Sequence, residues 1–556
     1  MPYRAPVSEI RFVLDHVVGF GRVAATGTFA EATPETVEAI LTEAGKMAEE
    51  VLAPLNRQGD LHPARLENGV VRTSPGFAEG FAAIARGGWL GMSADPEHGG
   101  MGLPTTLTMA VNEMIGSACL ALQLNPLMTQ GQIEALEAHA SDELKALYLP
   151  KLISGEWTGT MNLTEPQAGS DVGALRTRAE PNGDGTYAIT GQKIYISWGD
   201  NDFTENVCHL VLARLPEAAE GTKGISLFMV PKKLPDETGK AGVANSLKVV
   251  SLEHKLGLHG SPTAVMQYDG ATGWLVGEPH KGMAAMFTMM NNARLGVGVQ
   301  GLSIAEAAMQ HAIGYALDRK QGRTAHEGGT ILHHADVRRM VLSMKAHTFA
   351  ARALAMDTAV SLDMAKATGE AGWKARAALL TPIAKAYGTD TGIEIASQGI
   401  QVHGGMGFVE ETGAAQYARD VRVTAIYEGT NGIQAMDLVG RKMMDGGAAA
   451  FALMDEMAGT GHERLETALA ELRALTEWLL EQDMQDRFAG AVPYLAAFAR
   501  VLGASYHLRA AVADPARKPM ADVAVSMLLP EATAEMAKAR AGAAALYAVS
   551  DDVVAA

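Results

Sequence analysis

The sequence predicts a mainly α-helical protein with one β domain inserted between helical regions. Apolar residues recur at helical spacing from residue 8 to about 155 and again from about 280, whereas residues 156–275 form short β-rich runs bounded by Gly, Asp, Asn or Pro. Strands and helices do not alternate, so no βαβ rhythm calls for a parallel sheet. Single cores stop growing near about 250–300 residues, so a chain of 556 residues should divide into several domains.

Four domains are therefore expected along the chain. An N-terminal helical domain covers 1–155, with Thr33 as a helix N-cap before "PETVEAILTEAGKM", and the β domain covers 156–275. A second helical domain covers 276–442, and Ala- and Leu-rich amphipathic helices form a C-terminal helical extension over 443–556.

Composition restricts the class of partner. The chain has 46 basic and 63 acidic residues and a net charge of −17, which opposes binding to nucleic acids and to anionic membranes. Its two cysteines, Cys119 and Cys208, lack metal-ligand spacing, so neither a disulfide nor a metal site is expected. We find no signal-peptide pattern and no apolar stretch of about 18 residues, and we expect a soluble, cytoplasmic protein.

Two glycine-rich motifs resemble sites that the context does not support. "GVGVQG", Gly296–Gly301, matches a dinucleotide fingerprint but lies inside a helical stretch, which favours close helix packing instead. "HGGMG", His403–Gly407, is similar to a lipase oxyanion loop, yet the chain has no G-x-S-x-G elbow. Methionines at helical spacing, such as Met286 and Met289, are interpreted as core residues.

Several separated stretches have side chains suited to a polar ligand. "LTEPQAGSD" could donate backbone N–H and hydroxyl groups, and "GQKIYIS" places Tyr195 and Ser197 two apart on one strand face. Arg319 ends a long helix, and Gln401 precedes glycines that allow close backbone approach to a phosphate. Taken singly, each stretch has an ordinary interpretation. "LTEPQAGSD" could be a surface loop, "GQKIYIS" a strand that packs in a core, and Arg319 a cation at a helix C-terminus. Glu428, in "IYEGTNGIQ", would by itself be a solvated loop acid.

Taken together and in order, the motifs resemble those of the acyl-CoA dehydrogenase family of flavoproteins. "GWLGMSADPEHGGMGLP", "LTEPQAGSD", "GQKIYIS", "EHKLGLHGSPT", "YALDRK", "QVHGGMGF" and "IYEGTNGIQ" span roughly residues 35–440. The resemblance implies the family's α–β–α architecture, with FAD bound between the β domain and the second helical domain. It also implies a homodimer or homotetramer whose neighbouring subunit completes the site, an acyl-CoA substrate and an electron-transfer flavoprotein as electron acceptor.

The resemblance assigns roles to individual residues. FAD contacts are implied for Leu163, Thr164, Tyr195, Ser197, Arg319, Gln401, Gly404, Gly405 and Thr430. Ser170 and Arg294 would face the thioester, and Gly429 would leave room for it. Tyr195 stands where many members have tryptophan, and "SWG" replaces the commoner "TNG".

Glu428 becomes the expected catalytic base. Desaturation removes a proton from the α carbon while hydride leaves the β carbon for flavin N5. Burial beside an acyl chain should raise the pKa of Glu428. The positive end of a helix starting near Thr430 should lower that pKa, but by less than burial raises it. The Glu428 backbone N–H would stabilise negative charge on the thioester oxygen.

The substrate is expected from a closer resemblance. "YRAPVSEIRFVLDHV", "AIYEGTNGIQAMDLVGRK" and the tail beyond residue 442 resemble family members that convert 3-methylmercaptopropionyl-CoA to 3-methylthioacryloyl-CoA in dimethylsulfoniopropionate degradation. A general short- or medium-chain acyl-CoA dehydrogenase of β-oxidation is the alternative. A flavin oxidase or monooxygenase and a DNA-associated protein on the same fold are the remaining rivals.

Overall fold

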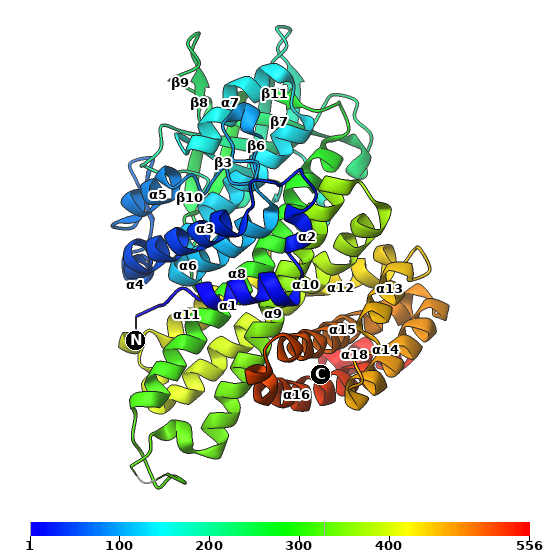
Figure 1. The fold of residues 1–556 in the computed structure, drawn as a ribbon. Helices are drawn as coiled ribbons and strands as arrows, with labels where there is room; N and C mark the ends of the chain where they lie inside the picture. The colour runs from blue at the N-terminus through cyan, green and yellow to red at the C-terminus, as the bar shows by residue number, and fades with distance from the viewer. Residues whose placement is uncertain (1, 327) are drawn as a thin grey trace. The chain divides into compact units, whose positions relative to one another are not determined.

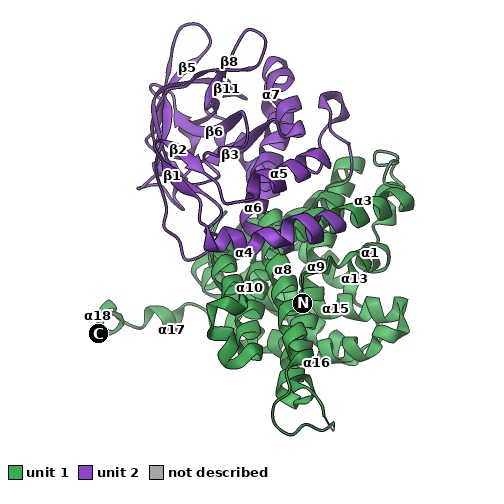
Figure 2. Ribbon diagram, turned by 90° about the vertical axis from the view of Figure 1, so that its left-hand side faces the viewer, with its two compact units in different colours: residues 1–45, 104–117, 294–556 green, residues 46–103, 118–293 purple. Residues whose placement is uncertain are grey.

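A computed structural model describes residues 2–326 and 328–556, which divide into two compact units. Unit 1 comprises Met1–Gly45, Pro104–Ser117 and Arg294–Ala556, and unit 2 comprises Lys46–Leu103 and Ala118–Ala293 (Figure 2). The predicted fold class, mainly helical with an inserted β domain and a C-terminal helical extension, is confirmed. The four-domain division with its boundaries stays a prediction.

Unit 2 contains the β domain and the helices next to it in sequence. Its helices are η2 (Ala48–Leu52), α4 (Ala53–Leu61), α5 (Phe77–Arg86), η3 (Pro96–His98), most of α6 (Thr105–His139), α7 (Asp142–Ser154), η4 (Val172–Ala174) and η5 (Gly221–Gly224). Its strands are β1 (Arg65–Glu67), β2 (Val70–Arg72), β3 (Trp157–Asn162), β4 (Arg178–Pro181), β5 (Tyr187–Ser197), β6 (Asn206–Arg214), β7 (Ile225–Pro231), β8 (Lys233–Pro235), β9 (Ala241–Ala244), β10 (Leu247–Leu252) and β11 (Thr263–Val276). The β1–β2 hairpin falls in a region expected to be helical, and its few residues are too short for a periodic signal.

The main sheet of unit 2 has seven strands and is largely antiparallel. Its order is β10-β11-β5-β4-β6-β3, and β7 pairs with both β11 and β6, so five strands form a closed circuit. Parallel pairing is limited to β3 with β6 and a single pair between β4 and β6. β6 and β7 are buried almost throughout, and one core packs them against α6 and α7 (Figure 1).

Unit 1 is helical. Its shorter elements are α1 (Val7–Phe12), η1 (Val13–Val17), α2 (Gly21–Ala24), η6 (Ile331–His333), η7 (Gly404–Phe408), η8 (Glu410–Thr412), α11 (Ala414–Val421), η9 (Arg422–Ala425), α12 (Asn431–Asp437), η10 (Leu438–Lys442), η11 (Pro515–Arg517), α17 (Ala544–Tyr547) and α18 (Asp551–Ala555). The longer helices are most of α3 (Pro34–Met47) and α8 (Gly282–Asp318), with α9 (Ala335–Thr368), α10 (Ala371–His403), α13 (Ala448–Met457), α14 (Glu463–Glu481), α15 (Met484–Ala513) and α16 (Lys518–Ala539). The Thr33 hydroxyl accepts from the Thr36 N–H at 3.2 Å, which confirms the predicted N-cap of α3.

Helices α8 and α10 cross through glycines. A Cβ at Gly298 would lie 2.7 Å from the Ala384 carbonyl oxygen, and one at Gly301 would lie 2.3 Å from the Gly388 carbonyl oxygen. Any larger side chain would force the two backbones apart. Close helix packing was the preferred interpretation of "GVGVQG", and the structure confirms it.

The C-terminal extension joins the rest of unit 1 through buried polar contacts. The Tyr506 hydroxyl of α15 donates to Asp357 of α9 at 2.6 Å, and Asp357 also pairs with Arg376 of α10 at 2.7 Å. Within the extension itself, Arg500 of α15 pairs with Glu531 of α16 at 2.8 Å. Beyond α16, α17 and α18 extend away from these helices (Figure 2).

Two helices correct the expectation that no apolar segment is long enough to cross a bilayer. Thr105–His139 and Met484–Ala513 meet the length and composition of a membrane span, and their most apolar windows are 100% and 67% buried. Core helices of globular proteins meet the same criteria, so these two are weak evidence for a membrane span.

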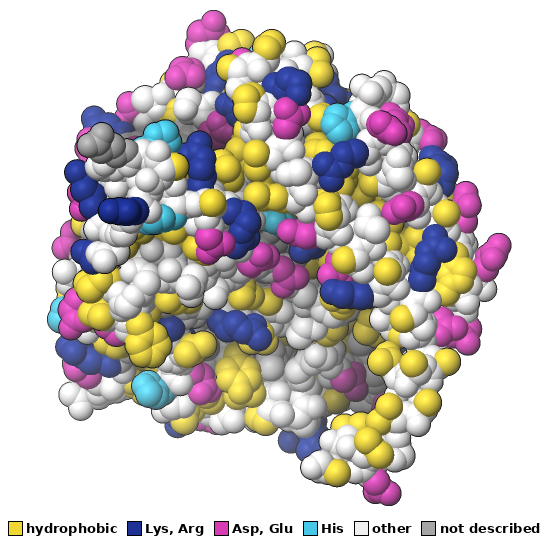
Figure 3. All heavy atoms as spheres, turned by 90° about the horizontal axis from the view of Figure 1, so that it is seen from below, with side chains coloured by type: hydrophobic (Ala, Val, Ile, Leu, Met, Phe, Trp, Pro, Cys, Tyr) yellow, Lys and Arg dark blue, Asp and Glu magenta, His cyan; other side chains and the backbone are white. Residues whose placement is uncertain are grey.

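On the face shown in Figure 3, acidic side chains are interspersed among the basic ones.

Candidate active site

The loop that carries Glu428 has an unusual backbone. Glu428 has a φ of 56° and Gly429 a φ of 86°, so two consecutive residues adopt the left-handed conformation. A non-glycine residue in this region is held there by its surroundings, and such residues gather at functional sites. Thr430 then caps α12 by accepting a hydrogen bond from the Ile433 N–H at 3.2 Å, so the helix begins where the sequence predicts.

Side chains from three helices hold this loop. The Tyr427 hydroxyl hydrogen-bonds to Gln300 of α8, and the Gln434 side-chain amide of α12 donates to the Glu428 carbonyl at 3.2 Å. From α10, Lys385 Nζ donates to the Gly429 carbonyl at 2.9 Å. The backbone on both sides of the Glu428 side chain is therefore fixed.

The Glu428 carboxyl lies in a low-polarity but cationic environment. Burial raises its pKa to about 7, and the positive charges of Arg294 and Lys385 oppose a larger rise. Its side chain is nevertheless partly accessible, as a base that must meet a substrate requires. Arg294 itself is buried and lies 3.7 Å from Asp437. Unit 1 thus brings Arg294, Glu428, Gly429 and Thr430 together, and their roles stay predictions.

In unit 2, Leu163 and Thr164 follow strand β3 and are fixed by β5. The Thr164 carbonyl accepts from the Ile194 N–H at 2.9 Å, and the Leu163 carbonyl accepts from Lys193 Nζ at 3.0 Å. Lys193 is fully buried and also pairs with Glu165 at 2.8 Å. Burial would raise the pKa of Glu165, but Lys193 and several hydrogen bonds outweigh it and hold that pKa at about 2.

Strand β5 presents Tyr195 and Ser197 at a bulge. Lys193 pairs with Met266 and Ile196 with Ala264, so β5 contains one residue more than β11 at this point. Tyr195 sits in the bulge with a φ of 60° and is 61% exposed. Tyr195 and Ser197 flank the buried Ile196, but the bulge interrupts the regular alternation of the strand, so their shared face stays a prediction. Ser170 lies exposed in the "EPQAGSD" turn.

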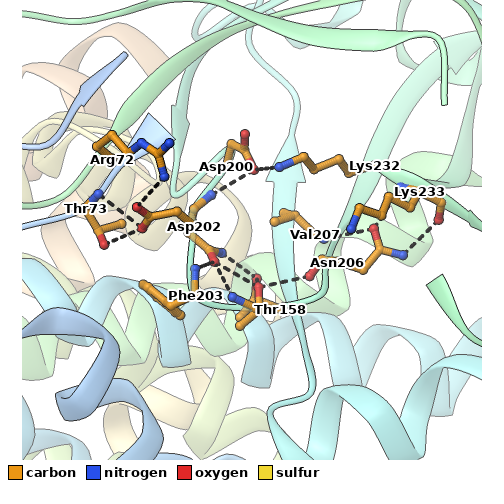
Figure 4. Close-up of polar contacts among 12 residues, drawn as sticks. Arg72, Thr73, Thr158, Asp200, Asp202, Phe203, Asn206, Val207, Lys232 and Lys233 are labelled. Carbon is orange, nitrogen blue, oxygen red and sulfur yellow. Dashed lines mark hydrogen bonds and ion pairs between the residues drawn. The ribbon is translucent and has the colours of Figure 1, made fainter. Parts of the chain in front are cut away.

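The segment after Ser197 is fixed by polar contacts (Figure 4). Lys232 Nζ lies 2.5 Å from an oxygen of Asp200, and the Asp202 carboxylate accepts from the Thr73 hydroxyl at 2.7 Å. The Asn206 side chain donates to the Lys233 carbonyl at 2.8 Å and so joins β6 to β8. These contacts fix the segment from Asp200 to Asn206 that links β5 to β6.

The expected pyrophosphate contacts lie on exposed ends of two unit 1 helices. Arg319 follows α8, Gln401 lies in the last turn of α10, and Gly404 and Gly405 follow that helix; all four residues are exposed. Cβ atoms built at Gly404 and Gly405 would meet nothing within 4 Å, so the loop has open space beside its backbone. Phe408, in the same loop, is 90% exposed.

Sequence reasoning missed the residues that support these loops. Lys193, Lys385 and Gln434 contact predicted site residues, and Glu165 pairs with Lys193, yet none of the four belongs to the predicted set. A signal existed for one of them, because Lys385 interrupts the small and apolar stretch "LLTPIAKAYGT" of a long helix. A charged residue in such a stretch is buried only with partners.

Comparison with known proteins now identifies the family. The N-terminal, middle and C-terminal domain models of acyl-CoA dehydrogenases match residues 34–156, 160–271 and 280–444. The chain belongs to the acyl-CoA dehydrogenase family, whose members are flavoproteins, and it is an acyl-CoA dehydrogenase enzyme.

Similar proteins extend this result over most of the chain. A 3-methylmercaptopropionyl-CoA dehydrogenase from Ruegeria pomeroyi is 47% identical, over 89% of this chain and 88% of its own length. The broad-specificity linear acyl-CoA dehydrogenase FadE5 from Mycobacterium tuberculosis is 35% identical, over 89% and 84%. The crystal structure of Caenorhabditis elegans ACDH-11 in complex with C11-CoA superposes with a TM-score of 0.78 at 23% identity and covers 90% of this chain and 88% of its own; it shows the shared fold.

Proposed function

We propose that the protein dehydrogenates a short acyl-CoA thioester between its α and β carbons, with Glu428 as the base that removes the α proton. The main support is the Glu428 carboxyl, whose pKa is raised to about 7. It lies on a loop that side chains from three helices hold in a left-handed conformation. A carboxylate with that pKa is a stronger base than an ordinary one, and about half of it is ionised near neutral pH.

The neighbouring groups of the chain would assist the same step. The Glu428 backbone N–H would donate to the thioester oxygen and stabilise the charge that develops there as the α proton leaves. Gly429 leaves space for the thioester beside that N–H. Arg294 holds positive charge near the base, and Ser170 offers an exposed hydroxyl to the CoA portion.

The residue types fit FAD as cofactor, which when bound supplies the acceptor for the β hydride. Tyr195 has an exposed ring beside the Ser197 hydroxyl, and these two, with Leu163 and Thr164, would lie against the flavin. The exposed Arg319 guanidinium would pair with the pyrophosphate. Open space beside Gly404 and Gly405 would admit a phosphate held also by Gln401, across a contact between subunits of a homodimer or homotetramer. The Thr430 hydroxyl accepts the N-cap bond and keeps its own proton to donate to the cofactor.

Replacing the base tests this proposal. In Glu428→Gln, shape and hydrogen bonding persist but the proton cannot be accepted, so anaerobic flavin reduction by butyryl-CoA should slow by at least about a hundredfold. FAD content and acyl-CoA binding should persist. Glu463→Gln, an exposed change on α14, is the control and should reduce normally. Wild-type reduction in Glu428→Gln would remove Glu428 from the mechanism.

We propose 3-methylmercaptopropionyl-CoA as the preferred substrate, with 3-methylthioacryloyl-CoA as product. The similarity to the R. pomeroyi enzyme supports it, whereas the similarity to FadE5 supports general linear acyl-CoA oxidation as the alternative. A thioether sulfur replaces one methylene, a change that an apolar pocket discriminates by only about 1–3 kcal/mol. Both this substrate and butyryl- to hexanoyl-CoA should be oxidised, with higher kcat/KM for the thioether. Preference for long-chain, branched or aromatic acyl-CoA would contradict the substrate proposal alone.

We also propose an electron-transfer flavoprotein as electron acceptor in the cytoplasm. An oxidase on the same fold would pass its electrons to oxygen. After anaerobic reduction by substrate, the dehydrogenase should reoxidise slowly in air and rapidly with an electron-transfer flavoprotein. Fast reoxidation by air alone would favour the oxidase.

A further inference from the structure

Lys385 is a fully buried cation next to the proposed base. It lies in the middle of α10, where most residues from Ala377 to Gly392 are buried, and its own side chain is 0% exposed. Removing an ammonium group from water is costly, so such a lysine persists only where its donors are satisfied and its charge is useful. Nothing in the proton transfer described above requires a lysine at this position.

The Lys385 ammonium hydrogen-bonds to both sides of the residue that follows Gly429. It donates to the Gly429 carbonyl at 2.9 Å and to Asn431 Oδ1 at 2.9 Å. Asn431 is fixed in turn, because its Nδ2 donates to Asp390 Oδ1 at 2.7 Å and to the Thr389 hydroxyl at 3.0 Å. One turn of α10 therefore holds the segment from Gly429 to Asn431.

These contacts oppose the strain in the loop. The left-handed conformation of Glu428 is unfavourable for a residue with a Cβ, and Gly429 continues it. In this conformation the Glu428 carbonyl accepts a hydrogen bond from the Gln434 side-chain amide. The Gly429 carbonyl accepts from Lys385 Nζ and from the same Gln434 amide. Without the lysine, the Gly429 carbonyl would keep only the longer contact to Gln434, at 3.4 Å.

The charges around Lys385 and Glu428 come from several elements. Arg294 of α8 and Lys385 of α10 both stabilise the Glu428 carboxylate. Asp437 of α12 and Arg441 of η10 face Arg294, while Asp390 of α10 faces Lys385. The two hydrogen bonds from Lys385 go to neutral oxygens, so its charge is not neutralised by direct contact with a carboxylate there.

We propose that Lys385 is a positioning residue: it holds the Gly429–Asn431 segment so that Glu428 faces the substrate, and its positive charge favours the carboxylate form of Glu428. The inference rests on the proposed role of Glu428. It assigns two separable effects to one side chain, a geometric effect through the two hydrogen bonds and an electrostatic effect through the charge.

Two variants separate these effects in the FAD-loaded enzyme. Lys385→Met removes both the hydrogen bonds and the charge. Anaerobic reduction by butyryl-CoA should slow at least about tenfold at pH 7. The acid limb of its pH profile should also move to higher pH by roughly half a unit to one unit. Asn431→Ala removes one hydrogen bond and keeps the charge, so it should slow reduction without moving the limb. Lys374→Met, an exposed change on the same helix, should alter neither.

The outcomes distinguish this inference from the proposed function. A wild-type rate and a wild-type pH profile in Lys385→Met would overturn the whole inference. A slower rate with the acid limb of the pH profile at its wild-type position would overturn the electrostatic effect. If Lys385→Met does not fold, an unchanged rate in Asn431→Ala overturns the positioning role. Failure of the proposed function would appear instead in Glu428→Gln, as undiminished reduction.

Discussion

Two fully buried lysines, one in each unit, hold the backbone of two predicted site loops but have different partners. In unit 2, Lys193 donates to the Leu163 carbonyl and pairs with the Glu165 carboxylate at 2.8 Å. In unit 1, Lys385 donates to the Gly429 carbonyl and to an amide oxygen of Asn431. Burial lowers the pKa of both lysines to about 8.

The difference shows how the same side chain can serve stability or reactivity. Glu165 compensates the charge of Lys193, and the pair leaves little net field on its surroundings. The two hydrogen bonds of Lys385 go to neutral oxygens, so its charge acts on Glu428. A neutralised lysine fixes geometry, whereas a lysine held by neutral oxygens also changes the chemistry of a neighbouring acid.

The largest expected effect is on the stability of unit 2. Lys193→Met leaves the buried Glu165 without its cation, and breaking a buried ion pair on one side costs about 3–5 kcal/mol. Lys385→Met leaves only neutral oxygens and should cost clearly less. Urea unfolding followed by circular dichroism measures both. Lys193→Met combined with Glu165→Gln should recover part of the loss; an equal loss in the two single variants would contradict the comparison.

A second effect should appear in acid. Because the pKa of Glu165 is lowered to about 2, its ionised form stabilises the folded state above its ordinary pKa near 4.5, and that stability is lost as pH falls from there toward 2. The full contribution is about 3 kcal/mol. In urea unfolding between pH 5 and 3, Glu165→Gln should therefore show a shallower loss of stability than wild type. Parallel curves would contradict the assignment.

The smallest effect concerns activity rather than stability. Glu428 must be deprotonated to act, and its pKa is raised to about 7, so kcat/KM should rise with pH through about 7. Below that value the rate should fall about tenfold per pH unit. Initial rates with butyryl-CoA from pH 5.5 to 8.5 measure the limb. A profile that is flat down to pH 5.5 would show that the base has an ordinary pKa.

The sequence predicted the order of elements because their signals are local. Helical periodicity, strands bounded by turn residues and Thr33 before Pro34 all appear in the structure near their predicted positions. The glycines of "GVGVQG" were also interpreted correctly, since small residues inside a helix allow another backbone to approach. The β1–β2 hairpin was missed because three-residue strands have no measurable period.

The site was predicted from ordered motifs, and these could not reveal its support. Glu428 and Thr430 lie two positions apart in sequence, whereas Lys385 of α10 lies more than 40 positions earlier and contacts Gly429 and Asn431 of the same segment. The bulge that places Tyr195 at a φ of 60° depends on the register between β5 and β11, which no local pattern specifies.

The sequence by itself determined the family, the helical and β regions, and the acid expected to act as base, because these depend on residue type and spacing along the chain. The tertiary structure decided what surrounds that acid: burial that raises its pKa to about 7, a left-handed backbone, and cations at Arg294 and Lys385 from two other helices. Burial and charge act through space rather than along the chain, so only the packing of α8, α10 and α12 could set the strength of the base.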